Sequence, residues 1–163
     1  MRCKWFLLPG LLLVVSFGAL RWFPPYTEQI ETHRGGVVSI LRDDGWVPHL
    51  TVNTQSDADY ATGWIHAEDR LWQMDMLRRL GSGRMAEIIG AKMLEFDQVM
   101  RTLSFWNLAK ENYAAQPLEV KVSMLDFTNG INDNVKQRWI LPLEYWITWS
   151  EWEEWHPSDV FVI

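Results

Sequence analysis

The sequence contains one cysteine, Cys3, and this scarcity excludes two means of stabilising a fold. A single thiol can form neither an internal disulfide nor a cysteine-based zinc site. Positive charge is also in the minority, because 15 Lys and Arg residues face 21 Asp and Glu residues and leave a net charge of -6. A negative surplus opposes the phosphate backbone, so we expect no nucleic acid among the partners.

Short signatures of several enzyme classes are missing as well. No serine lies in a GxSxG or SxxK motif, and no helix carries the HExxH spacing of a zinc hydrolase. Gly81, Gly83 and Gly90 match neither the Walker nor the dinucleotide pattern, and no strand precedes them. We therefore interpret these glycines as helix ends.

Apolar residues are plentiful, with 48% hydrophobic and 13% aromatic residues. Such a chain has enough apolar surface to offset the entropy lost on ordering, which favours a packed fold over disorder. Its 163 residues suffice for one domain with a modest core. The closing residues, DVFVI, carry no stop signal such as Gly, Pro or a polar tail, so we expect a fragment of a larger protein.

The N-terminus has the layout of a secretory signal. MRCK supplies two positive charges, and residues 5–20 form an uncharged apolar run closed by Arg21. We predict a signal peptide or signal anchor over residues 1–22 and a secreted, periplasmic or membrane-anchored protein, with any anchoring by residues 5–23. Residues 23–35, which include Pro24 and Pro25, are predicted to be a linker, and residues 36–163 the folded region.

Two short strands are expected at the start of the folded region. Residues 37–41 are β-branched and apolar, and residues 46–52 follow them after the turn sequence RDDG. Pro48 cannot donate to a sheet ladder, so we place the second strand at an edge.

Helices dominate the rest of the chain. Asp57 is the expected N-cap of a long helix whose apolar residues recur as far as Leu80, on most of its circumference. A helix of this kind is normally buried. Further helices are predicted over 97–113 and 118–139, and a new one is predicted to begin at Asp159.

One face of the long helix carries candidate chemistry. His66, Asp69, Arg70 and Gln73 share a stripe, and His66 and Asp69 lie three residues apart. They could form an acid/base pair or supply two metal ligands, but a metal needs at least one more protein ligand. We favour a polar stripe that bridges a buried helix to neighbouring backbone.

Two other groups invite a functional interpretation. Asp43, Asp44 and His49 flank the predicted turn and could suggest hydrolysis or calcium binding, although turn formation explains the aspartates directly. Tryptophans recur at every third position from Trp146 to Trp155 and could form a carbohydrate or membrane surface. Because that period matches neither helix nor strand, we favour packing in irregular structure.

Seven segments taken in order resemble one family, the penicillin acylases, which are N-terminal nucleophile hydrolases. They are RDDGWVPHL, GWIHAEDRLWQMDMLRR, GRMAEIIG, FDQVMRTL, FTNGINDNV, LPLEY and WHPSDV, and the similarity covers roughly residues 37–163. Their order and spacing are far more specific than any one segment. The first departs from the family, which usually has a glycine just before Val-Pro-His where Trp46 stands here. A tryptophan adopts positive φ only at a cost, so we expect a different local turn.

The resemblance implies an α+β fold, in which this chain is a mainly helical piece of a four-layer αββα sandwich with a short N-terminal strand pair. It implies an exported precursor cut into an α chain and a β chain, whose first serine is the nucleophile for hydrolysis of N-acylated small molecules. Expected partners are the remainder of the precursor and a small-molecule amide.

Catalytic residues and the calcium site of the complete enzyme would lie outside this chain, so we assign it no catalytic, cofactor or metal residue and expect it to be inactive alone. The motif residues are then structural: Arg42, Asp43, His49, His66, Asp69, Arg70 and Gln73.

A rival interpretation is a non-catalytic, secreted or membrane-anchored binding module that uses its tryptophans as a contact surface. A third is a truncated product that does not fold stably, and its exposed apolar helix faces would cause aggregation.

Overall fold

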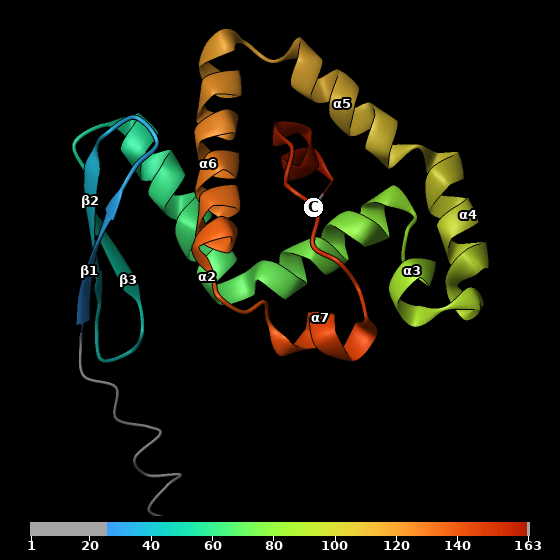
Figure 1. Cartoon of the computed structure of the whole chain (residues 1–163). Helices are drawn as coiled ribbons and strands as arrows, with labels where there is room; N and C mark the ends of the chain where they lie inside the picture. The colour runs from blue at the N-terminus through green and yellow to red at the C-terminus, as the bar shows by residue number, and fades with distance from the viewer. Residues whose placement is uncertain (1–25, 163) are drawn as a thin grey trace, which may run out of the picture.

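Three antiparallel strands open the part of the chain that the computed structural model describes, residues 26–162 (Figure 1). β1 (Tyr26–Glu31) pairs with β2 (Val37–Arg42), and β2 pairs with β3 (Pro48–Thr51). The predicted strand pair is therefore present as β2 and β3, but the sheet has a third strand. β3 lies at an edge and begins at Pro48, where a missing N–H costs no ladder hydrogen bond.

The linker predicted over residues 23–35 is wrong for Tyr26–Glu31, which forms β1. Ile30 lies opposite Val38 in the sheet, and both side chains are buried. Ile30 is the only buried residue of β1, so the alternation that marks a strand hardly shows in the sequence.

The predicted signal segment, residues 1–22, lies outside the described residues, as do the predicted anchor residues 5–23 and residues 23–25 of the linker. Within residues 26–162, no helix is both long and apolar enough to cross a membrane.

Helices make up most of the remaining described chain. In order they are α2 (Gln55–Ser82), α3 (Ala86–Ile89), η1 (Ala91–Met93), α4 (Leu94–Leu103), α5 (Phe105–Ala115), α6 (Leu118–Gln137), α7 (Leu143–Thr148) and η2 (Pro157–Phe161). The mainly helical α+β class predicted from the sequence is confirmed, and α2 and α6 match the predicted long helices.

Three helix boundaries differ from the prediction. Thr54, not Asp57, caps α2, because its hydroxyl accepts the backbone N–H of Asp57 at 3.1 Å. The helix predicted over 97–113 is two helices, since Ser104 adopts a left-handed conformation with φ 61° between α4 and α5. The last element is a 3₁₀ helix that begins at Pro157, two residues before the predicted start.

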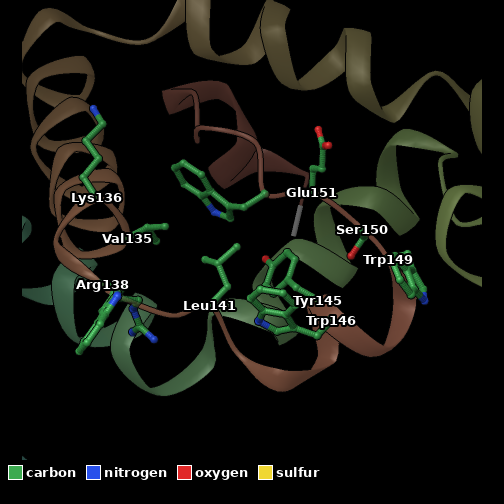
Figure 2. Close-up of a pocket in the computed structure, with 11 residues that line it drawn as sticks. Val135, Lys136, Arg138, Leu141, Tyr145, Trp146, Trp149, Ser150 and Glu151 are labelled. Carbon is green, nitrogen blue, oxygen red and sulfur yellow. The ribbon is translucent and has the colours of Figure 1, made fainter.

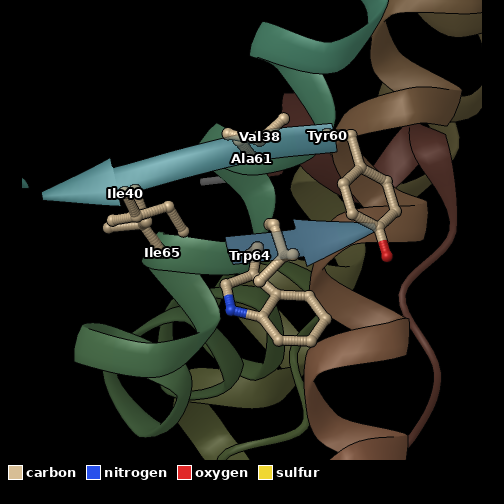
Figure 3. Packing of buried hydrophobic residues seen from close by; sticks show 7 residues of the cluster. Val38, Ile40, Tyr60, Ala61, Trp64 and Ile65 are labelled. Atoms are coloured by element: carbon tan, nitrogen blue, oxygen red, sulfur yellow. The ribbon is translucent and has the colours of Figure 1, made fainter. Parts of the chain in front are cut away.

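The first half of α2 packs on the sheet to form one core cluster (Figure 3). Val38 and Ile40 of β2 point at α2, where Tyr60 and Trp64 face them. Because all four are buried, this cluster fixes the sheet on the helix and resists a one-residue slip of register.

The second half of α2 packs against α6 and the C-terminal segment around a second buried cluster, which includes Leu71, Ile131 and Trp155. The two helices cross (Figure 1), and their backbones approach closely at Tyr60 and Gly63, in the first half of α2. A Cβ added at Gly130 would lie only 2.0 Å from the carbonyl oxygen of Tyr60. Glycine at this position therefore permits the close crossing.

Candidate functional site

The turn between β2 and β3 is organised by Asp43. Its Oδ1 accepts the backbone N–H groups of Gly45 and Val47, both at 2.9 Å, and its Oδ2 lies 2.9 Å from His49 Nε2. The hydrogen bond with His49, helped by the backbone donors, lowers the pKa of the Asp43 carboxyl. These contacts account for Asp43 and His49 as turn residues, while Asp44 is exposed.

Trp46 occupies the left-handed region with φ 64°, so the tryptophan adopts the positive φ that a bulky residue takes only at a cost. Its ring meets the Tyr26 ring edge-on at 5.8 Å, and the Arg42 guanidinium lies 5.7 Å from its centre. These ring contacts offset part of the cost of a left-handed conformation for a bulky residue.

Arg42 joins the sheet to the middle of α2. Its guanidinium is buried and donates to Glu68 at 2.8 Å and to the two Asp69 oxygens at 3.0 and 3.2 Å. Of the predicted stripe, Asp69 thus contacts the sheet. The contact lies next to Arg70, whose φ of -137° and ψ of 18° mark a kink in α2.

The other stripe residues are not brought together. His66 Nδ1 donates to the Thr62 carbonyl at 2.7 Å, and the ring lies edge-on to Phe127 of α6. Arg70 and Gln73 have exposed side chains. No hydrogen bond or ion pair links His66 to Asp69 within the described chain, so the arrangement offers no acid/base pair.

A buried ionic network in the last turns of α2 was not foreseen. Asp75 is fully buried and accepts from Arg78 at 2.6 Å and from Arg79 at 2.9 Å. Arg78 also donates to the Asp159 carboxylate at 3.3 Å, and Arg79 to the Glu151 carbonyl at 2.8 Å. The network therefore fastens the C-terminal segment to α2. Its signal in the sequence is an acid followed by two arginines, at spacings of three and four, on a helix that is otherwise largely apolar.

Two later motif residues hold the loop that follows α2. Asp97 of α4 accepts the backbone N–H groups of Met85 and Ala86, both at 2.8 Å. Arg101 donates to the Gly83 carbonyl at 2.9 Å. Both contacts satisfy backbone groups left open at helix ends.

The Asn132 side chain of α6 binds both backbone groups of Trp155. Its amide donates to the Trp155 carbonyl at 3.0 Å and accepts the Trp155 N–H at 2.9 Å. Asp159 in turn accepts the His156 N–H at 3.0 Å as part of a capping box on η2. Asn132 thus joins α6 to the C-terminal segment, 23 positions further along the chain.

A hollow lies between the end of α6 and the segment that carries α7 (Figure 2). It holds about 840 Å³. We call it the tryptophan hollow, and its lining residues are Val135, Lys136, Arg138, Trp139, Leu141, Tyr145, Trp146, Trp149, Ser150, Glu151 and Trp152.

The tryptophan series divides between this hollow and the core. Trp155 is buried and Trp152 is half-buried, as expected for packing in irregular structure. Trp146 lies on α7 and Trp149 is its C-cap, and both are exposed, Trp149 at 93%. The packing prediction is therefore wrong for these two.

The described residues contain no group of three or more His, Cys, Asp or Glu side chains that could hold a metal ion. The described residues form a helical scaffold with a small sheet. Their charged motif residues connect its elements through hydrogen bonds and ion pairs.

Comparisons with known proteins agree with this architecture. The family model for penicillin amidase matches residues 37–163. Penicillin acylase 2 proenzyme of Pseudomonas sp. (strain SE83) is 36% identical over 124 residues, covering 74% of this chain and 16% of that protein. Acyl-homoserine lactone acylase QuiP of Pseudomonas aeruginosa is 34% identical over 123 residues, covering 75% of this chain and 14% of its own length.

A thermostable penicillin G acylase from Alcaligenes faecalis shares the fold. It superposes with a TM-score of 0.63 at 24% identity, over 86% of this chain and 70% of the solved chain. The chain belongs to the penicillin amidase family. It spans only 14–16% of the length of the curated relatives named above.

Proposed function

We propose that this chain is the N-terminal part of the α chain of a penicillin acylase-like amidohydrolase. The complete enzyme hydrolyses the amide bond of an N-acylated small molecule. The observation that carries the proposal is the penicillin amidase match over residues 37–163, together with relatives named for acting on penicillins and on acyl-homoserine lactones.

In this proposal the reaction proceeds by acyl transfer to the serine that begins the β chain, and then to water. The free α-amino group of that serine acts as the base, because a hydroxyl needs an adjacent base to attack at neutral pH. Neither the serine nor the groups that stabilise the oxyanion belong to this chain, which is inactive alone. The contacts that Arg42, Asp75 and Asn132 make support a role for this chain as a structural scaffold.

The proposed enzyme acts outside the cytoplasm, as a secreted, periplasmic or membrane-anchored protein. Support comes only from the sequence layout of residues 1–22, with two positive charges before an apolar run.

The test is the coding sequence downstream of Ile163, followed by expression of the whole reading frame. We expect it to continue to a serine at a cleavage junction and to yield two chains that hydrolyse N-acyl amides. A stop codon directly after Ile163 would contradict the proposal for this product, and so would amide hydrolysis by the 163-residue chain alone.

One observation favours a second candidate, a non-catalytic binding module. Trp139, Trp146 and Trp149 are exposed around one hollow, as a contact surface requires. If the reading frame ends at Ile163 and the product is a folded monomer, this candidate replaces the first.

A further inference from the structure

Arg138 differs from the other arginines of residues 26–162 that are buried or half-buried. Each of those pairs with a carboxylate: Arg42, Arg78, Arg79 and Arg84. Arg138 is the half-buried C-cap of α6, and it forms no ion pair within the described residues. Charge that is withdrawn from water is normally paired, so this guanidinium indicates a place where a carboxylate binds.

The hydrogen bonds of Arg138 go to neutral groups. Its Nε donates to the Asn134 side-chain oxygen at 2.7 Å, and its Nη2 donates to the Ala67 carbonyl at 2.7 Å. Nη1 donates to no group of residues 26–162. The two bonds fix the guanidinium between α6 and α2 and leave the N–H groups of Nη1 for a further acceptor.

The positive charge of Arg138 is only partly compensated. Burial lowers the pKa of the guanidinium below its usual value, and the more distant carboxylates of Glu68 and Asp69 oppose this shift in part. Both of those carboxylates bond Arg42 instead. An arginine stays charged at neutral pH even so, and a carboxylate at hydrogen-bond distance offsets the cost of its burial.

The surroundings of Arg138 suit an apolar ring. Arg138 lines the tryptophan hollow, whose volume of about 840 Å³ lies within the usual range of ligand pockets, roughly 300–1,000 Å³. Figure 2 shows Leu141 between Arg138 and the rings of Tyr145 and Trp146. Tryptophan and tyrosine rings pack well on other aromatic rings, so the hollow offers stacking surface beside one cation.

The other charges of the hollow do not compete for an anion at Arg138. Lys136 already pairs with Glu154 at 2.9 Å. The Glu151 carboxylate lies on the opposite side of the hollow from Arg138 (Figure 2). The negative end of a ligand is therefore favoured at Arg138 and disfavoured at the far side.

We propose that the tryptophan hollow binds a small carboxylic acid with an aromatic body, whose carboxylate pairs with Arg138 and whose ring packs against Trp146. The inference goes beyond the proposed function and does not depend on it, because binding is measured without catalysis.

The test compares two ligands of nearly the same shape. The probe is naphthalene-2-carboxylate, and its uncharged counterpart is naphthalene-2-carboxamide. Each is titrated by calorimetry into the full 163-residue chain and into three variants, Arg138→Gln, Trp146→Ser and Arg70→Gln. Arg70→Gln is the matched control, because it removes an exposed arginine of α2 that does not line the hollow.

We expect the wild-type chain to bind the carboxylate at least about tenfold more tightly than the carboxamide, since only the carboxylate gains a charge-assisted hydrogen bond. Arg138→Gln removes this preference and leaves the affinity for the carboxamide unchanged. Trp146→Ser weakens both ligands by a similar factor, and its exposed side chain makes loss of folding an unsuitable explanation. Arg70→Gln behaves as the wild type.

Circular dichroism checks that every variant keeps its helices. Equal affinity of the wild-type chain for the two ligands overturns the proposal, as does no binding at millimolar carboxylate or an unchanged preference in Arg138→Gln. Self-association of the chain that the carboxylate does not reverse assigns the hollow to a second copy and overturns it too. In the complete reading frame Arg138→Gln must have the same effect, and a hollow closed to the carboxylate there contradicts the proposal.

Discussion

Trp46 shows how a single residue can hold an unfavourable conformation. Its φ of 64° suits glycine, and contacts with Tyr26 and Arg42 compensate. Trp46→Ala and Trp46→Gly both remove the ring, but only glycine relieves the backbone. We expect the glycine variant to be more stable than the alanine variant by about 1 kcal/mol, measured by denaturant unfolding. An alanine variant of equal or greater stability would contradict this explanation.

Asp75 is the carboxylate that the two buried arginines of α2, Arg78 and Arg79, share. Asp75→Asn leaves two buried guanidinium groups without their shared carboxylate, although Asp159 still accepts from Arg78 and Glu87 from Arg79. We expect a loss of about 3 kcal/mol in the free energy of unfolding, the low end of the cost of breaking a buried pair. The measurement is chemical unfolding followed by circular dichroism.

The matched control for Asp75 is Glu154→Gln, which breaks the ion pair with Lys136, where both side chains are more than half exposed. An exposed pair contributes less than about 1 kcal/mol. If Asp75→Asn is as mild as this control, the network does not stabilise the fold.

At the scale of elements, the irregular segment before η2 is tied to the loop after α2 by Arg84 and Glu153. Arg84 Nη1 donates to Glu153 Oε2 at 2.8 Å, and this pairing lowers the pKa of Glu153 to about 2. A carboxylate with a depressed pKa stabilises the fold above its unfolded pKa, about 4.5, and loses that contribution as the pH falls to about 2.

The prediction is a stability difference between the wild type and Glu153→Gln that is constant near neutral pH, shrinks from about pH 4.5 to about pH 2, and vanishes below. Thermal unfolding across this range measures it, and the Glu153 carboxylate is exposed enough that the difference should be small and salt-sensitive. A difference that grows as the pH falls would contradict the assigned pairing.

Elements with strong local patterns could be predicted from the sequence. The periodic apolar residues of α2 and α6 identified both helices, and the β-branched run of β2 identified its strand. β1 was not predicted, because Ile30 is its only buried residue and no alternating pattern results. The interruption between α4 and α5 at Ser104 was not predicted, because a non-glycine residue adopts the left-handed conformation there without any signal in the local sequence.

The residues of the candidate site also differ in how far they could be predicted, depending on whether their partners are near in the sequence. Asp43 was interpretable as a turn residue because its partners lie within six positions. The partners of Arg78 and Arg79 in the C-terminal segment lie 72 to 81 positions away, so no local pattern announces them. Exposure of Trp146 and Trp149 was missed because it depends on where α7 packs.

At the scale of the whole molecule, we propose that this chain supplies a scaffold to a larger amidohydrolase. The family motif residues within it form hydrogen bonds between elements. Arg42 connects the sheet to α2, Asp97 and Arg101 hold the loop after α2, and Asn132 holds the C-terminal segment. Such a contact can be exchanged between relatives if its geometry is kept, and in the proposed enzyme the activity comes from the remainder of the protein.

The most direct test is therefore a transplant. Residues 37–163 replace the matched region of penicillin acylase 2 proenzyme of Pseudomonas sp. (strain SE83), and the rate of penicillin hydrolysis by the purified chimera is measured. We predict a cleaved, two-chain product that hydrolyses penicillin, and loss of this product when Asp75→Asn is added. A soluble, folded chimera that stays uncleaved and inactive would contradict it.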